Sequence, residues 1–197
     1  DSGYRGPVAV IGNNLGNLEI QEKLVGKENI VLGFGSFGGY SEDGKIIYYD
    51  GRTMKKPMKP RATTLGIINQ EAERALSVVQ KALLSSGLPY IVSRDMRSWL
   101  VCHTALVFPL AGAMYACGGN QERTCRTRDA IVLGIRACKE LLKALRRIGY
   151  LLEPGLLKAL FFIPEWLLLK ILIKTLKSEL ARVGMFGHAN APGGRNE

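Results

Sequence analysis

The period of the hydrophobic pattern changes near residue 68, and this change constrains the fold more than any other feature of the sequence. Before it, short apolar runs lie between glycine-rich turns, which is typical of strands. After it, apolar residues recur every three or four positions, which is typical of amphipathic helices. The pattern predicts a sheet-containing domain over residues 1–68 and an all-α domain over residues 69–197.

The first domain is expected to contain several strands and one short helix. Residues 7–12 are a continuous apolar run, which is typical of a strand buried on both faces. Residues 30–40 are apolar with four glycines, so this strand must pass close to another backbone or to a ligand. The turn at residues 42–44 predicts a hairpin with residues 46–49. The remaining elements are a helix at residues 18–25, a basic, proline-containing loop at residues 54–61 and a strand at residues 63–68.

The second domain is expected to be built on three long helices. Asn69 is expected to cap the first helix, which ends at Gly87. Residues 96–117 are apolar on almost all sides, which predicts a buried central helix that Pro109 kinks or divides. Residues 128–148 have the clearest amphipathic pattern in the chain. Shorter elements are an extended piece at residues 90–92, two or three helices over residues 153–183 and a Gly/Asn/Pro-rich tail from residue 187 without a closing element.

The formal net charge of +10 points to three classes of partner: a phosphate-bearing ligand, a nucleic acid or an anionic membrane. A solvated basic surface is the simpler alternative. The basic residues are scattered along the chain without interleaved aromatic residues, so no nucleic-acid partner is expected. Three lysines, a proline and a glutamate interrupt the most apolar stretch, residues 156–176, so no membrane span is expected there. Peripheral membrane contact is an alternative there, because Leu, Phe and Trp lie beside these lysines.

Four cysteines are present, and their spacing excludes the common metal and redox motifs. Cys102, Cys117, Cys125 and Cys138 form no C-x-x-C pair and match no zinc pattern. We therefore expect free thiols and no metal site. Free thiols are typical of a reducing compartment, which favours the cytoplasm.

No catalytic or nucleotide-binding motif of high specificity is present. The sequence has no Walker A loop, no H-E-x-x-H and no G-x-S-x-G. Residues 33–38 match G-x-G-x-x-G by letter. In a dinucleotide fold this loop joins a strand to a helix, whereas here it lies in an extended run that leads into a hairpin. We therefore predict a structural role for these glycines.

Three polar segments are candidates for a functional site. Asn13 and Asn14 follow the first strand, at the edge where open α/β sheets bind ligands, and their amides suit a nicotinamide amide or a substrate hydroxyl. A plain turn is the alternative there. His103 is the best proton donor available near neutral pH, with a satisfied core histidine as the alternative. His188 and Asn190 form a polar segment after the last helices, with a surface loop or frayed end as the alternative.

Residues 13–19 (N-N-L-G-N-L-E) resemble the Q-N-G-x-G-N-E-E turn of ketopantoate reductases. The resemblance extends over nearly the whole chain and rests on the order of several segments. These are a glycine-rich strand at residues 31–39, a hairpin to Tyr49, the T-x-G strand at residues 64–66, Gly87-Leu88-Pro89, Asp95-Met96-Arg97-Ser98-Trp99 and Pro109-Leu110-Ala111.

The resemblance implies an α+β fold class: the remnant of a Rossmann-type α/β sheet, followed by an all-α C-terminal domain like that of 6-phosphogluconate dehydrogenase. The family reduces 2-oxo acids such as 2-dehydropantoate (ketopantoate) with NADPH. Asn13 and Asn14 are then expected to contact the cofactor, and His188 and Asn190 the substrate; the family allows a homodimer. The family's G-x-G-x-x-G fingerprint is expected before Asp1, so this chain is expected to be incomplete and to bind NADPH weakly or not at all by itself.

One catalytic position departs from the family's pattern. The catalytic lysine would fall at Val101 or Leu100, according to the segment used for alignment. His103 is the remaining ionisable group on that helix able to lose a proton near neutral pH, so it is the expected proton donor, within reach of Asn13. The alternative is a non-catalytic relative, whose helical domain serves dimerisation or ligand sensing.

Overall fold

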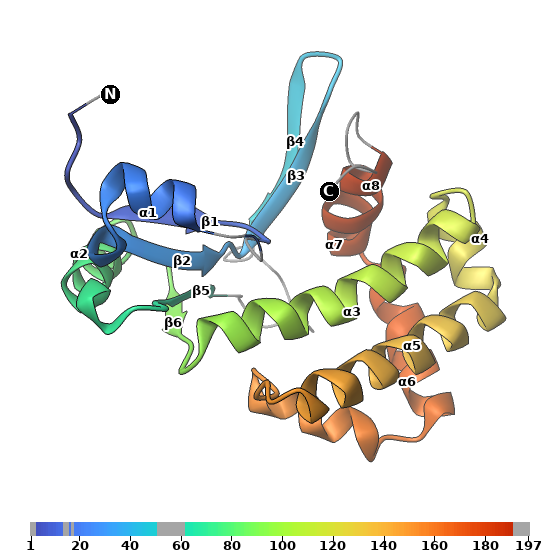
Figure 1. Ribbon diagram of the computed structural model, residues 1–197. Coiled ribbons are helices and arrows are strands. Elements are labelled where there is room, and N and C mark those ends of the chain that lie inside the picture. Colours follow the sequence, from blue (N-terminus) through green and yellow to red (C-terminus); the bar gives the residue numbers. More distant parts are fainter. Residues whose placement is uncertain (1–2, 14–15, 17, 51–61, 191–197) are drawn as a thin grey trace. The chain divides into compact units, whose positions relative to one another are not determined.

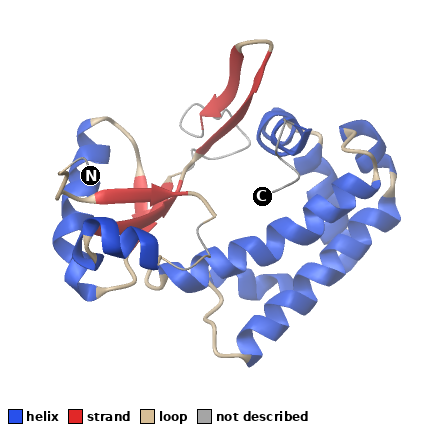
Figure 2. Ribbon diagram, turned by 45° about the horizontal axis from the view of Figure 1, so that its top comes forward, coloured by secondary structure: helices blue, strands red, loops and turns tan. Residues whose placement is uncertain are grey.

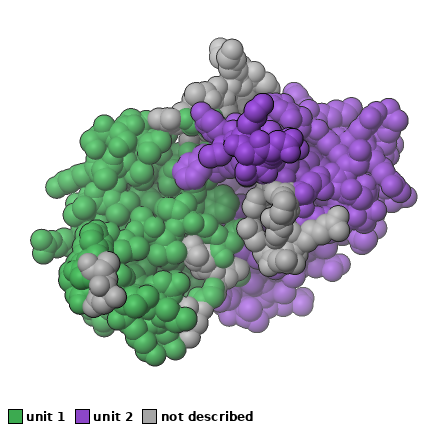
Figure 3. Space-filling view, turned by 90° about the horizontal axis from the view of Figure 1, so that it is seen from above, with its two compact units in different colours: residues 1–36, 50–101 green, residues 37–49, 102–197 purple. Residues whose placement is uncertain are grey.

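The computed structural model describes residues 3–13, 16, 18–50 and 62–190, and it has the mixed α+β class expected from the sequence (Figures 1 and 2). The chain divides into two compact units (Figure 3). Unit 1 contains residues 1–36 and 50–101, and unit 2 contains residues 37–49 and 102–197. The division at residue 68 into a nucleotide-binding remnant and a helical domain stays a prediction, because compactness alone assigns no role to either part.

Unit 1 is built on a mixed four-stranded sheet in the order β1-β2-β5-β6. The pairs β1–β2 and β5–β6 are parallel, whereas β2 and β5 are antiparallel. The strands expected at residues 7–12, 63–68 and 90–92 and the helix expected at residues 18–25 are confirmed. The bounds are β1 Val8–Ile11, β2 Ile30–Phe34, β5 Thr63–Gly66, β6 Tyr90–Val92, α1 Glu19–Val25, η1 Lys27–Asn29, η3 Gln70–Ala72 and α2 Glu73–Ser85.

The strand buried on both faces is β2, not β1 as the sequence predicted. Successive side chains of a strand point to opposite faces. Ile30 and Leu32 pack with Met96 and Leu100 at the start of helix α3 (Met96–Ala116), which covers one face of the sheet. Val31 packs on the other face against Leu76 and Val79 of helix α2, where apolar residues recur every three or four positions. Along β1 half-buried and exposed positions alternate, since this strand pairs with β2 alone among the described strands.

The predicted strand over residues 30–40 is two strands in two sheets. β2 ends at Phe34, and β3 Phe37–Glu42 pairs with β4 Lys45–Asp50 in a separate hairpin of unit 2. The hairpin itself is confirmed. Asp43 and Gly44 have φ of 49° and 73°, which is the positive pair that a type I′ turn requires.

Asn69 does not cap the helix that follows it. Its side chain makes no capping hydrogen bond, and its amide nitrogen donates to Glu22 Oε1 at 3.3 Å. The first turn is the 3₁₀ segment η3, and α2 then runs to Ser85. Gly87 has φ of 66° just beyond the end of α2, so the predicted stop is confirmed. The loop predicted at residues 54–61 lies outside the described residues.

Gly33 allows three strands to approach one another in unit 1. A Cβ at this position would lie 2.6 Å from Ile11 Cδ1 and 3.1 Å from the carbonyl oxygen of Thr64. We therefore expect Gly33→Ala to lower the free energy of unfolding by about 1–3 kcal/mol, because a methyl group must displace its neighbours. Urea denaturation measures the change. A Cβ at Gly112, within helix α3, meets nothing within 4 Å. Gly112→Ala is therefore the matched control, and a loss of stability as large as that of Gly33→Ala would contradict the packing.

Unit 2 is helical apart from its hairpin. The predicted helix over residues 128–148 is confirmed, and its stripe faces the core: Ile131, Ile135, Cys138 and Leu142 are all buried. The segment after residue 187, expected without a closing element, stays helical as far as residue 190. The bounds are α3 Met96–Ala116, α4 Gln121–Arg126, α5 Arg128–Arg147, η4 Gly155–Phe161, α6 Glu165–Leu176, α7 Glu179–Ala181, the π-helix η5 Arg182–Gly187 and α8 His188–Asn190.

Helix α3 continues through Pro109 without dividing. It is long and apolar enough by length and composition to cross a membrane, a criterion that core helices also meet. Its buried residues pack against protein in both units. Met96 and Leu100 pack on β2 in unit 1, and Cys102 packs with Leu142 of α5 in unit 2. However, only 28% of its most apolar 18-residue window is buried, so α3 is not the buried central helix that the sequence predicted.

Candidate functional site

The turn after β1 places Asn13 at the carboxyl end of a parallel strand. The backbone N–H of Gly12 donates to the carbonyl oxygen of Gly33 at 2.9 Å and so extends the β1–β2 ladder. Gly12 has φ of 142°, a value that side-chain-bearing residues rarely adopt. Asn13 is exposed directly after this turn, at the sheet edge where α/β folds bind ligands. Asn14 lies outside the described residues.

The G-x-G-x-x-G match at residues 33–38 does not form a nucleotide-binding loop. It joins strand β2 to strand β3, and no helix follows it. Gly33 is buried within β2 against Ile11 and Leu65. The run therefore cannot cradle a pyrophosphate, and the predicted structural role of its glycines is confirmed.

His103 lies in helix α3, where its side chain is half-buried. Its neighbours Cys102 and Ala105 are fully or largely buried in a cluster with Leu142 and Leu152. Asn13 belongs to unit 1 and His103 to unit 2. The predicted approach of His103 to Asn13, and with it the catalytic role, stays a prediction.

The two candidate positions for the family's lysine differ in their surroundings. Leu100 is 1% exposed and packs with Ile30, Leu32 and Met96. Val101, the next residue on α3, is half-buried. Neither position offers an amine, and the ionisable side chains that follow Trp99 on this helix segment are the buried thiol of Cys102 and His103.

Asn190 has a structural contact in unit 2. Its amide nitrogen donates to the carbonyl oxygen of Gly119 at 3.0 Å, across 71 positions of sequence. Gly119 has φ of 70°, and a Cβ there would collide with the Asn190 side chain. Asn190 thus holds the loop between α3 and α4. His188 begins the same short helix, α8, and the substrate contacts predicted for both residues stay predictions.

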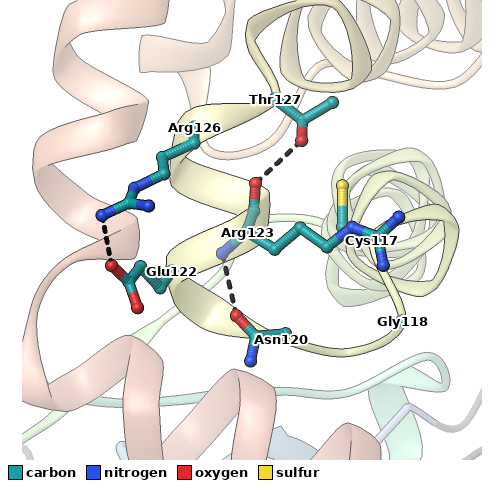
Figure 4. A pocket seen from close by; sticks show the side chains of 7 residues that line it. All are labelled: Cys117, Gly118, Asn120, Glu122, Arg123, Arg126 and Thr127. Carbon is teal, nitrogen blue, oxygen red and sulfur yellow. Dashed lines mark hydrogen bonds and ion pairs between the residues drawn. The ribbon is translucent and has the colours of Figure 1, made fainter.

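The loop that Asn190 holds also lines an open pocket of about 400 Å³ (Figure 4). Arg126 is paired with Glu122 at 2.5 Å, and the side-chain oxygen of Asn120 accepts a hydrogen bond from the Arg123 backbone at 2.8 Å. Among the described residues no carboxylate pairs with Arg123, so its guanidinium can receive an anionic group. The lining residues are Cys117, Gly118, Asn120, Glu122, Arg123, Arg126 and Thr127.

Sequence reasoning missed this pocket. The signal that could have identified it is local: three arginines fall within residues 123–128, a denser cluster of arginines than elsewhere in the chain. The pocket offers cationic charge but, among its lining residues, no group suited to proton transfer near neutral pH. A second open pocket is lined by Arg128, Asp129, Val132, Glu165, Trp166 and Leu169.

The cysteines are free and buried, as expected for core thiols. Burial raises the pKa of Cys138 to about 11, and its thiol donates to the carbonyl oxygen of Leu106 at 3.5 Å. Burial also raises the pKa of Cys125 above its ordinary value. Both thiols therefore stay protonated near neutral pH and are poor nucleophiles. Among the described residues, no group of three or more His, Cys, Asp or Glu side chains could hold a metal ion.

Comparison with known proteins gives limited information. No family model matches the chain, and no curated protein matches it. A solved structure of a candidate 2-dehydropantoate 2-reductase from Enterococcus faecalis is similar over 90% of this chain and 68% of that protein, with 16% identity and a TM-score of 0.39. At this level the similarity does not by itself establish a shared fold or activity.

Proposed function

We propose that this protein is an NADP-dependent oxidoreductase related to the ketopantoate reductases, which reduces a 2-oxo acid such as 2-dehydropantoate to the 2-hydroxy acid. The proposal rests on the position of Asn13. It follows a parallel strand, lies exposed at that strand's carboxyl end and precedes helix α1. Ligands of open α/β sheets bind at this kind of edge.

The order of the remaining elements supports the same proposal. After Asn13 come the glycine-rich strand, the hairpin, strand β5 and helix α2, and then the long helix α3 with Pro109 inside it. This is the order in which the resembling segments of the family occur. The four free, buried cysteines support a reducing, cytoplasmic location, which belongs to the proposal together with a homodimeric state.

Each predicted site residue has a role in the proposed reaction. NADPH supplies the hydride when it is bound. The exposed amides of Asn13 and, by the resemblance, Asn14 hydrogen-bond the nicotinamide end of the cofactor. His103 gives a proton to the alkoxide oxygen that develops on the 2-oxo group. His188 and Asn190 orient the substrate carboxylate.

The described residues fit only part of an NADPH site. Asn13 suits the nicotinamide amide, but the glycines at residues 33–38 lie within and between strands and provide no cradle for the pyrophosphate. We therefore propose that NADPH binding needs a pyrophosphate cradle that the described residues do not supply.

A non-catalytic relative is the second candidate, and one observation favours it. Leu100, one of the two positions for the family's lysine, is buried among apolar side chains, and Val101 offers no ionisable group. Such a protein would bind the nucleotide or the acid but would not catalyse the reduction. Its helical unit would then serve dimerisation or ligand sensing.

Turnover distinguishes the two candidates. Protein expressed from the complete reading frame is mixed with NADPH and a panel of 2-oxo acids that includes 2-dehydropantoate. We expect oxidation of NADPH that depends on one of these acids, with the 2-hydroxy acid identified by mass spectrometry. Nucleotide binding without turnover of any acid would support the non-catalytic relative instead.

The Asn13→Ala variant of the same protein tests whether Asn13 contacts the cofactor. Loss of one amide that contacts bound cofactor is expected to raise the Kd for NADPH about two- to tenfold, since a hydrogen bond contributes roughly 0.5–1.5 kcal/mol. Fluorescence of bound NADPH measures it. Gln70→Ala removes another exposed amide of unit 1 and is the control. An unchanged Kd in Asn13→Ala would show that the cofactor does not reach this edge.

A further inference from the structure

Unit 2 carries an apolar and basic surface over residues 155–177, formed by the exposed sides of η4 and α6, which follow one another directly in the chain (Figure 1). From it we propose a further property: the protein binds peripherally to the surface of an anionic lipid bilayer through this η4–α6 surface. The property is independent of the oxidoreductase activity proposed above.

The 3₁₀ geometry of η4 explains the exposed apolar groups. Residues three apart lie in one row of a 3₁₀-helix. Leu157 and Leu160, three apart in η4, pack into the core of unit 2, as does Ile163 just after it. Leu156 near the start of η4 and Phe162 directly after its end lie on the outside, where they are 81% and 85% exposed. Two large apolar side chains therefore project together into solvent.

Helix α6 continues the surface with an aromatic and basic row. Leu168, Leu169 and Leu176 face the core, so the opposite side of the helix faces solvent. That side carries Trp166, Lys170, Lys174 and Lys177 at spacings of four, four and three, which places them on one face. The Nζ of Lys170 lies 5.0 Å from the centroid of the Trp166 ring, which is 59% exposed.

The surface is predominantly basic. Residues 155–177 contain four lysines and a single acidic residue, Glu165. Nε and Nη2 of Arg136 donate to the two carboxylate oxygens of Glu165 at 2.7 and 2.9 Å, and this neighbour keeps the pKa of Glu165 below its ordinary value. The carboxylate is thus ionised and paired, and the lysines determine the sign of the surface.

This combination fits a lipid headgroup layer better than other partners. Exposed Trp, Phe and Leu flanked by lysines are the composition that inserts at a membrane interface, and anionic lipids attract the lysines. A second copy of the chain would bring the same lysines against one another in a symmetric contact. A nucleic acid would leave the exposed apolar side chain of Leu156 without a contact to make.

Fluorescence of Trp166 tests the proposal directly. The chain has two tryptophans, so in Trp99→Phe the emission comes from Trp166 alone. Vesicles of phosphatidylcholine and phosphatidylserine should shift this emission to shorter wavelength, and lipids brominated on the acyl chains should quench it. Vesicles of phosphatidylcholine alone should have a much weaker effect. Absence of both shift and quenching with the anionic vesicles would overturn the proposal.

Matched variants test which side chains bind. Co-sedimentation with the anionic vesicles should fall at least about tenfold when Leu156 and Phe162 are both changed to Ser, because their apolar area no longer enters the interface. The control is Ile20→Ser with Leu24→Ser, which removes two exposed apolar residues of α1, 70% and 68% exposed. Equal losses in the two pairs would contradict the proposal.

Charge neutralisation gives the second series. Lys170→Gln with Lys174→Gln should weaken binding by about fivefold per lysine, and added salt should reduce the difference. Lys45→Gln with Lys81→Gln is the control, on exposed lysines outside the surface. Tighter binding to a single-stranded RNA than to anionic vesicles would overturn the proposal. So would a dimer in sedimentation equilibrium that Phe162→Ser dissociates, if vesicles remain unbound.

Discussion

Replacement of His103 by alanine is expected to lower the kcat for the 2-oxo acid by about 10²–10⁴-fold, the usual contribution of a positioned general acid. The physical reason is that, with Val101 and Leu100 at the candidate lysine positions, His103 is the side chain of that helix segment able to give up a proton near neutral pH. The measurement is kcat at saturating NADPH and substrate, in protein from the complete reading frame. KM should change far less than kcat, since the lost contact strengthens in the transition state.

Two controls separate proton transfer from packing at this position. His103→Gln keeps a polar side chain but cannot titrate, so it should be as slow as His103→Ala, and the pH dependence assigned to the acid should disappear in both. Val107→Ala truncates a half-buried residue one turn further along α3 and should leave kcat within a few-fold of the parent. An unchanged kcat in His103→Ala would show that His103 is not the proton donor and would favour the non-catalytic relative.

Leu142→Ala is expected to lower the free energy of unfolding by roughly 2–5 kcal/mol, the range for a large buried side chain whose removal leaves a cavity. Leu142 is 0% exposed and packs with Cys102, Ala105 and Leu152 in unit 2. The adjacent Leu141 is 41% exposed on the outer side of α5. Leu141→Ala should therefore cost under about 1 kcal/mol. Urea denaturation followed by circular dichroism compares the two variants, and similar losses would contradict the orientation of α5.

The elements predicted correctly are those whose signals are local. Helix α5 follows from an apolar stripe within one segment, and the β3–β4 turn follows from Asp43-Gly44, whose positive φ values need no distant partner. The division of residues 30–40 between two sheets could not be predicted. It depends on β2 pairing with β5 and on β3 pairing with β4, and these are choices of partner that a hydrophobic period does not encode.

The same distinction applies to the candidate site. The exposure of Asn13 after a strand was predictable, because strand, glycine and turn are contiguous in the sequence. The contact between Asn190 and Gly119 was not predictable, because it joins residues 71 positions apart. The sequence indicated apolar and basic residues over residues 156–176, but it did not show which of them are exposed. A hydrophobic pattern does not show which of its apolar residues lie outside the core, because exposure depends on the packing of the whole unit.

The most direct test of the central claim is transfer of deuterium. Protein from the complete reading frame is incubated with 2-dehydropantoate and NADPH that carries deuterium at C4 of the nicotinamide ring, on one face or the other. We predict that deuterium from one of the two labelled cofactors appears at C2 of the 2-hydroxy acid product, since a reductase that holds both reactants transfers the hydride from a single face. Product without deuterium from either cofactor, or no product from any 2-oxo acid of the panel, would contradict the proposed function.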